Sequence, residues 1–186
     1  MDFKFHCIPM NMLNWIMPTI NWRYVSTKVY LTYPLKTRQM LNTKIEKRNI
    51  SKINRFGLFA KEIVFKDEII WAPTDDAVKI IPIADLEKLS LTEQQDWIDH
   101  CYQMGDYYHM DTDDTRLMNH SCEPNTLDYP DDNPTMIIAA RDIEKDEEVT
   151  WNYLPFMNPF QVFQCNCGSK NCVDIVKKNA VVKHNS

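Results

Sequence analysis

One stretch of eleven residues gathers most of the reactive side-chain types that proteins use. Residues 116–126 read RLMNHSCEPNT and contain a cation, a histidine, a serine, a cysteine, two asparagines and a glutamate. Such a set suits a catalytic nucleophile, a metal site, a ligand clamp or a polar loop. The rest of the chain has to discriminate between these four interpretations.

A second group of cysteines, near the C-terminus, predicts a zinc site. Cys165, Cys167 and Cys172 have the spacing C-x-C-x-x-x-x-C, and Gly168 allows a tight turn between them. A disulfide between cysteines so close in sequence is strained, whereas the thiolates of a C-x-C pair can share one zinc ion. A structural zinc needs four ligands, and Cys122 is the natural fourth. The alternative fourth ligands are Cys7, Cys101, His100 and His120.

Nucleophilic catalysis is disfavoured for the 116–126 stretch. Cys122 lies near His120 in sequence, but a cysteine that binds a metal cannot also attack a substrate. Ser121 lacks the G-x-S-x-G context of a nucleophile elbow. A purely structural polar loop remains as an alternative.

The elements that position these residues are mostly short strands. Residues 56–60 and 62–71 are rich in β-branched and aromatic residues and predict two strands, as do residues 135–140 and 147–153. Ser90 and Glu93 form a capping-box pattern that begins a helix, which we expect to end near Gly105. Residues 107–125 are polar and we expect them to be irregular. The pattern predicts a β-rich α+β domain whose functional residues lie in loops.

Composition and charge exclude several functions. The 186 residues are 44% hydrophobic and 25% charged, and no apolar run is long enough for a membrane span. Residues 1–50 carry eight Lys/Arg and two Asp/Glu, a net charge of +6, whereas residues 51–186 carry 13 and 24, a net charge of −11. An acidic body disfavours nucleic acid and favours basic peptides. With no secretory signal, we expect an intracellular protein with reduced cysteines.

Four motifs together resemble those of SET-domain protein lysine methyltransferases. Asn119–Asn125 (NHSCEPN) is similar to the family signature N-H-S-C-x-P-N. Phe56–Ala60 resembles the opening G-x-G-[VL]-[FA] segment, and Asp146–Tyr153 resembles G-E-E-[LV]-T-[FYW]-[DN]-Y. The cysteine run 165–172 resembles the post-SET zinc motif. The motifs occur in family order over residues 52–172, with a short middle stretch typical of compact, bacterial-type members.

The chain departs from the family pattern at three positions. Arg55 replaces the first glycine of G-x-G, Asp146 replaces the glycine of G-E-E, and Asn152 stands at the [DN] position. Glycine at this position would let a cofactor come close to the backbone, and the arginine side chain at position 55 opposes that approach. This substitution keeps a second interpretation open, a non-catalytic SET-like module that binds a protein partner.

The resemblance implies a SET fold, with small curved sheets around a threaded C-terminal loop, that uses S-adenosylmethionine and zinc. It divides the chain into a basic extension (1–50), a SET domain (51–156), a post-SET zinc segment (157–178) and a tail (179–186). The substrate implied is a lysine in a basic segment of a protein, a histone for example. The residues implied to contact the cofactor are Phe56, Gly57, Leu58, Trp71, Asn119, His120 and Phe163.

The same resemblance implies roles in catalysis and metal binding. Tyr153 matches the catalytic tyrosine of the family. Tyr108 matches a second active-site tyrosine, with Tyr107 as its rival. Trp151 and Tyr153 are implied to line the substrate channel. The zinc ligands implied are Cys122, Cys165, Cys167 and Cys172.

Overall fold

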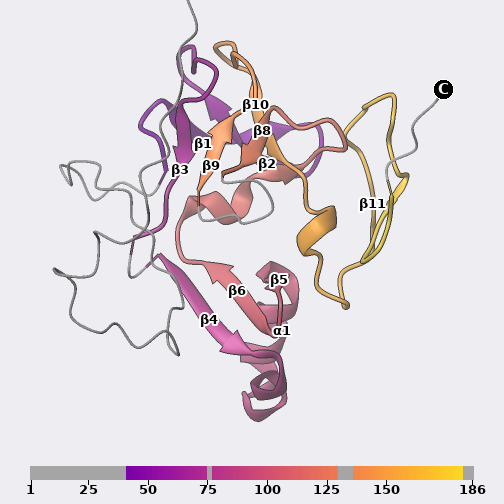
Figure 1. The fold of residues 1–186 in the computed structure, drawn as a ribbon. Helices are drawn as coiled ribbons and strands as arrows, with labels where there is room; N and C mark the ends of the chain where they lie inside the picture. The colour runs from indigo at the N-terminus through magenta and orange to yellow at the C-terminus, as the bar shows by residue number, and fades with distance from the viewer. Residues whose placement is uncertain (1–40, 75–76, 130–135, 182–186) are drawn as a thin grey trace, which may run out of the picture. The chain divides into compact units, whose positions relative to one another are not determined.

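The computed structural model describes residues 41–74, 77–129 and 136–181. Within these ranges the strands are short and the helices few (Figure 1). The strands are β1 (Ile45–Ser51), β2 (Arg55–Ala60), β3 (Ile69–Trp71), β4 (Val78–Pro82), β5 (Tyr102–Met104), β6 (Tyr107–Asp111), β7 (Asn119–His120), β8 (Thr126–Asp128), β9 (Ile137–Ala139), β10 (Glu148–Trp151), β11 (Phe163–Gln164) and β12 (Ile175–Val176). The helices are α1 (Leu91–His100) and three 3-10 turns, η1 (Ile83–Lys88), η2 (Asp114–Leu117) and η3 (Leu154–Phe156). The β-rich α+β architecture is therefore confirmed.

The strands form four small sheets with the orders β1-β2-β10-β7, β3-β9-β8, β4-β6-β5 and β11-β12. In the first sheet, β10 pairs antiparallel with β2 and parallel with β7. The late strand β10 therefore lies between two earlier strands, and it brings the motif around residue 150 beside the motif around residue 120. This pairing is what assembles the two motifs into one site.

Two hydrophobic cores support the larger sheets, and a third cluster contains Met157, Val176, Cys122 and Cys165. One packs β1, β2, β3, β9 and β10 around fully buried residues such as Leu58, Val64 and Val149. The other lies between α1 and the β4-β6-β5 sheet, around Trp97 and Tyr108. No helix in the described ranges is long and apolar enough to cross a membrane.

Local structure corrects several of the predicted boundaries. The predicted strand over residues 62–71 is a strand only from Ile69, because Asp67 adopts a positive φ of 66° in a turn. The capping box at Ser90 is confirmed, but α1 ends at His100, where Cys101 turns to an extended conformation. Gly105 instead makes the turn between β5 and β6, with a φ of 56°.

Two further expectations change. Residues 107–125 are not irregular throughout, since they contain β6, η2 and β7. Residues 41–50, which we assigned to the N-terminal extension, belong to the folded body, because β1 pairs with β2 and Leu41 bridges to Trp71. The remainder of the extension, including Cys7, lies outside the described residues.

Candidate active site and metal centre

Four cysteines from two distant parts of the chain meet in one cluster. The Sγ atoms of Cys122, Cys165, Cys167 and Cys172 all lie within 4.8 Å of one another. Cys122 follows β7, and the other three lie on the segment that connects β11 to β12. Thiolates around a tetrahedral zinc, with Zn–S bonds of about 2.3 Å, are about 3.8 Å apart. The 3.9 Å separation of the Cys122 and Cys165 sulfurs matches that spacing.

The surroundings of the cluster suit thiolates. The backbone N–H of Val173 donates to Cys122 Sγ at 3.4 Å, and that of Asp174 donates to Cys172 Sγ at 3.4 Å. Burial raises the pKa of Cys122 to about 11, so without a cation this thiol stays protonated. Burial also raises the pKa of Cys167, but hydrogen bonds outweigh this effect and lower it to about 6. Four sulfur atoms in one cluster, two of which accept these N–H hydrogen bonds, fit a structural zinc ion.

His120 connects the cysteine cluster to Tyr153. Its Nδ1 accepts a hydrogen bond from the Tyr153 backbone N–H at 3.1 Å, and its Nε2 lies 3.3 Å from Cys122 Sγ. Because Nδ1 is the acceptor, Nε2 carries the proton and donates to the sulfur. Burial lowers the pKa of His120 to about 4, which keeps the ring neutral. The resemblance assigns His120 to the cofactor, and the cysteine spacing keeps it as an alternative zinc ligand, but neither predicts its hydrogen bond to the Tyr153 backbone.

A cavity of about 700 Å³ lies beside the cluster, a size typical of ligand sites. Of the predicted cofactor residues, Phe56, Asn119, His120 and Phe163 line it. Tyr153 lines it too, with its ring 6.4 Å from that of Phe163 in an edge-on contact. The wall from Phe163 to Asn166 belongs to the segment that the cysteines hold in place.

Gly57 is explained by packing inside the protein rather than by this cavity. A Cβ atom at Gly57 would lie 2.2 Å from Oε1 of Glu148 and 3.0 Å from Nδ2 of Asn119. The Glu148 carboxylate accepts hydrogen bonds from Ser51 Oγ at 2.8 Å and from Asn119 Nδ2 at 2.7 Å. Asn119 Nδ2 also donates to the Phe56 carbonyl at 2.6 Å. Three motifs are therefore cross-linked here, and only glycine fits between them.

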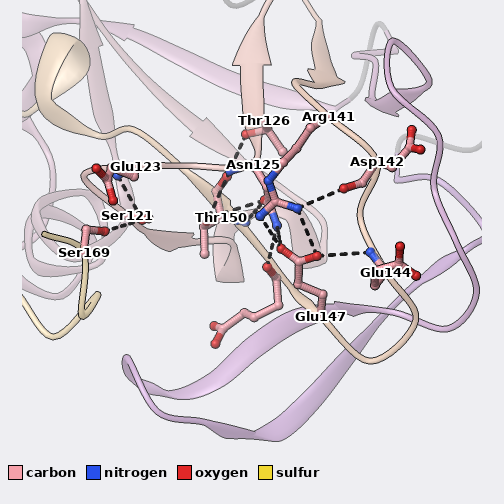
Figure 2. Close-up of polar contacts among 11 residues, drawn as sticks. Ser121, Glu123, Asn125, Thr126, Arg141, Asp142, Glu144, Glu147, Thr150 and Ser169 are labelled. Carbon is pink, nitrogen blue, oxygen red and sulfur yellow. Dashed lines mark hydrogen bonds and ion pairs between the residues drawn. The ribbon is translucent and has the colours of Figure 1, made fainter.

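A second network anchors the loop after β7 to β10, as Figure 2 shows. Asn125 donates through Nδ2 to Glu147 Oε1 and to the Glu148 carbonyl, both at 2.9 Å. Its Oδ1 accepts from the Thr150 backbone N–H at 2.9 Å. Arg141 forms an ion pair with Glu147 at 2.5 Å. The buried Asn125 amide thus fixes the loop that carries Cys122 and follows His120 of β7.

A smaller cavity of about 90 Å³ has aromatic walls. Trp151 stacks on Phe156 with ring centroids 5.4 Å apart, and it makes edge or tilted contacts with Tyr102 at 5.9 Å and Tyr153 at 5.6 Å. Trp151 Nε1 donates to Asp128 at 2.8 Å, which fixes the indole. The Tyr153 hydroxyl donates to the Met118 carbonyl at 2.5 Å. Burial raises the pKa of Tyr153 above its usual value, so the hydroxyl keeps its proton.

The structure places three of the predicted residues elsewhere. Tyr108 is only 2% exposed and packs in the α1 core, because alternate residues of β6 face opposite sides of the sheet. It lines neither of the two cavities, so the structure does not bring it together with the other predicted site residues. Tyr102 of β5, which no motif marks, lines the aromatic cavity instead. Trp71 also lines the aromatic cavity rather than the larger one, and Leu58 lies in the core.

Comparison with known protein families identifies the class to which this arrangement belongs. The SET domain matches residues 55–154, which is more than half of the chain. The match includes β2, β7 and β10, the strands that carry the motifs of the large cavity. The chain therefore belongs to the SET-domain family, and the predicted SET fold is confirmed.

Curated relatives are similar over part of their length. Histone-lysine N-methyltransferase ATX2 of Arabidopsis thaliana is 30% identical over 135 residues, which is 68% of this chain and 12% of the relative. Human histone-lysine N-methyltransferase 2B is 25% identical over 158 residues, 79% of this chain and 6% of the relative. Histone-lysine N-methyltransferase set-2 of Caenorhabditis elegans is 28% identical over 132 residues, 66% and 8% respectively. The matched region is thus a small part of each of these relatives.

Proposed function

We propose that this chain transfers a methyl group from S-adenosylmethionine to the side-chain amine of a lysine in a protein substrate. One observation carries the proposal: Tyr153 borders both the 700 Å³ cavity and the small aromatic cavity. A large site for a cofactor and a narrow site for an alkylamine, which meet at one tyrosine, give the alignment that in-line displacement requires.

The large cavity supplies the groups that would hold the cofactor. These are the Phe56 segment, Asn119, and the aromatic rings of Tyr153 and Phe163. When bound, S-adenosylmethionine supplies a methyl group on a positively charged sulfur. The chain's part is to orient that ligand and to exclude water, and Phe163 is 37% exposed, well placed at the cavity rim.

The small cavity supplies the site for the amine. Five aromatic residues line it, among them Tyr102, Trp151 and Tyr153, whose rings contact one another through Trp151. An apolar surrounding lowers the pKa of an ammonium group, and a neutral amine is the form that reacts. Aromatic faces also hold an ammonium by cation–π contact, which contributes about 0.5–2 kcal/mol.

The zinc is proposed to be structural. Cys122, Cys165, Cys167 and Cys172 would hold it with no open position for a substrate. The ion would fix the 163–166 wall of the large cavity and, through His120, the backbone at Tyr153.

The proposed substrate is a basic segment of a protein. The relatives are named histone-lysine methyltransferases, and histones are basic proteins. The net charge of −11 over residues 51–186 favours the approach of such a segment. Of the acidic residues near the motifs, Asp131 and Asp132 lie outside the described residues.

The test uses zinc-loaded protein, calorimetry with S-adenosylmethionine, and transfer of a labelled methyl group to core histones. We expect one-site binding and label on lysine. A matched variant, Asn119→Ala, removes the cross-link to Phe56 and should abolish cofactor binding. Binding of histones without any binding of the cofactor would instead support the non-catalytic module, for which Arg55 is the only sequence argument.

A further inference from the structure

Asp111 is an acidic group in a cavity that also has several aromatic walls. It ends β6 and lines the small cavity together with Tyr102, Trp151 and Tyr153. Its Oδ1 accepts a hydrogen bond from the Tyr102 hydroxyl at 3.3 Å. Among the ion pairs between described residues, none includes Asp111. A carboxylate in such a place is costly unless a cation arrives to pair with it.

Two further polar atoms indicate that the small cavity receives a polar ligand. Trp71 Nε1 and Thr115 Oγ1 are buried and have no hydrogen-bond partner among the described residues. Trp71 is 2% exposed and Thr115 is 4% exposed, and both line the same cavity as Asp111. Buried polar atoms without partners are rare in proteins, and they point to water or a ligand group that completes them.

The charged groups around Asp111 do not provide a resident cation partner. Asp113, two residues along the chain, raises the pKa of Asp111 by repulsion, in addition to burial. Asp99, His100 and Arg116 also line the cavity, but the ring of His100 pairs with Asp96 on α1, and Arg116 is in none of the ion pairs between described residues. The remaining titratable groups near this carboxylate are Tyr102, Tyr153 and His109. The His109 ring stacks on the Tyr102 ring, with the two ring centroids 5.5 Å apart.

We propose that the Asp111 carboxylate binds the ammonium of the substrate lysine and accepts its proton. This inference rests on the proposed function and adds a residue that the family motifs did not mark. One N–H bond of the ammonium breaks and one O–H bond forms on Asp111. The neutral amine then holds the lone pair that would form the new N–C bond while the S–C bond of the methyl donor breaks and leaves a neutral thioether. Asp111 later loses the proton to water, so the carboxylate is restored for the next turnover.

The raised pKa of Asp111 favours this proton transfer. Burial, and then repulsion from Asp113, raise its pKa to about 7, while the Tyr102 hydrogen bond opposes the rise. A free lysine has a pKa of about 10.4, which the aromatic cavity and the cofactor's positive sulfur lower. The two pKa values therefore approach each other, the condition under which proton transfer is efficient.

The first test needs no cofactor and no activity. The side-chain carboxyl carbons of labelled aspartates are followed by NMR against pH in the zinc-loaded full chain. One signal that titrates near pH 7 should vanish in Asp111→Asn. Methylammonium chloride, as a probe for the lysine head, should lower that midpoint relative to sodium chloride at equal ionic strength. A midpoint that does not respond to methylammonium would overturn the proposed contact.

The second test is the pH dependence of kcat/KM with core histones. In the wild type, activity should rise with pH through about 7, because the acceptor must be ionised. Asp111→Asn should lose about 10²–10⁴-fold at pH 7 and recover as pH approaches the pKa of lysine, with unchanged cofactor affinity. Asp111→Glu should recover part of the activity. Asp106→Asn, on an exposed turn residue, is the matched control and should leave the profile unchanged.

The outcomes separate this inference from the proposed function. A wild type that transfers no methyl group to any histone speaks against the function, while the NMR test still decides whether Asp111 contacts an amine. A wild type that is active, with an Asp111→Asn variant that keeps its turnover and pH profile, overturns the role of Asp111 alone. A variant that raises only the histone KM, equally at every pH, also overturns proton acceptance.

Discussion

The two cavities, both of which Tyr153 lines, differ in the segments that build them. The large one includes residues 162–166, which lead into the cysteine cluster, together with residues of β2 and β7. The small one includes none of these and takes residues from β3, β5, β6, β9 and β10 as well as from α1, η2 and η3. We therefore expect the cysteine cluster to affect ligand binding at the large cavity more than it affects the shape of the small one.

Removal of the metal should have the largest effect on the difference between the two cavities. Cys172→Ser deletes one ligand, so we expect loss of stoichiometric zinc and at least a tenfold loss of affinity for S-adenosylmethionine. Hydrogen exchange should increase in β11 and β12 and stay low in β2 and β10. Metal analysis, calorimetry and exchange on the same sample provide the measurement.

A control comes from the described cysteine outside the cluster. Cys101 is buried near Asn158 and is not one of the four, so Cys101→Ser should keep its zinc whatever it costs in stability. Full zinc content in Cys172→Ser would exclude this residue as a ligand. Increased exchange in β10 of that variant would show that the small cavity also depends on the metal.

Tyr153→Phe tests the one tyrosine among the five residues that line both cavities. The change removes the hydroxyl that donates to the Met118 carbonyl and keeps the ring. We expect kcat to fall about 10²-fold or more, while the affinity for S-adenosylmethionine stays within about threefold. Single-turnover kinetics and calorimetry separate the two quantities. If cofactor affinity falls as far as kcat, the hydroxyl belongs to the binding of the large cavity and not to the reaction.

Asp111→Asn tests the small cavity through the free energy of unfolding, without any measurement of activity. A raised pKa means that the folded protein holds a proton that the unfolded chain has released, so unfolding free energy falls as pH rises from about 4 to about 7. At pH 8 we expect the variant to be more stable by about 1–3 kcal/mol, and equally stable near pH 4. Urea unfolding at both pH values measures this. A stability difference between variant and wild type that is the same at both pH values would mean that the pKa of Asp111 is not raised.

How far the sequence predicted each cavity follows from how each is built. The large cavity is lined by residues of contiguous motifs, so Asn119 and His120 could be predicted from the family resemblance, and Cys165, Cys167 and Cys172 from their spacing. Tyr102 and Asp111 carry no motif and reach the small cavity because β5 pairs with β6 beside β10. Tyr108 shows the same limit, since strand register decides which face a side chain takes. Pairing between distant strands is what local patterns do not contain.

The smallest effect is expected at Arg55, where the chain departs from the family pattern. Its φ of 44° lies in the left-handed region, and the other non-glycine residues with positive φ in the described ranges are aspartates and an asparagine. The backbone therefore already has the conformation that glycine would take. Relief of strain in Arg55→Gly is offset by the entropy of glycine, so we expect a net change within about 1 kcal/mol.

The same variant tests whether Arg55 hinders the large cavity that it lines. Its guanidinium lies 4.9 Å from the centre of the Phe56 ring, so the side chain is held along the wall. Because the backbone does not change, we expect the affinity of Arg55→Gly for S-adenosylmethionine to stay within about threefold of the wild type. Arg55→Lys, which keeps the charge and the β-carbon, is the control. A tenfold gain in affinity for S-adenosylmethionine in the glycine variant alone would show that the arginine obstructs the cofactor. Weak binding at the large cavity would then be due to this one side chain.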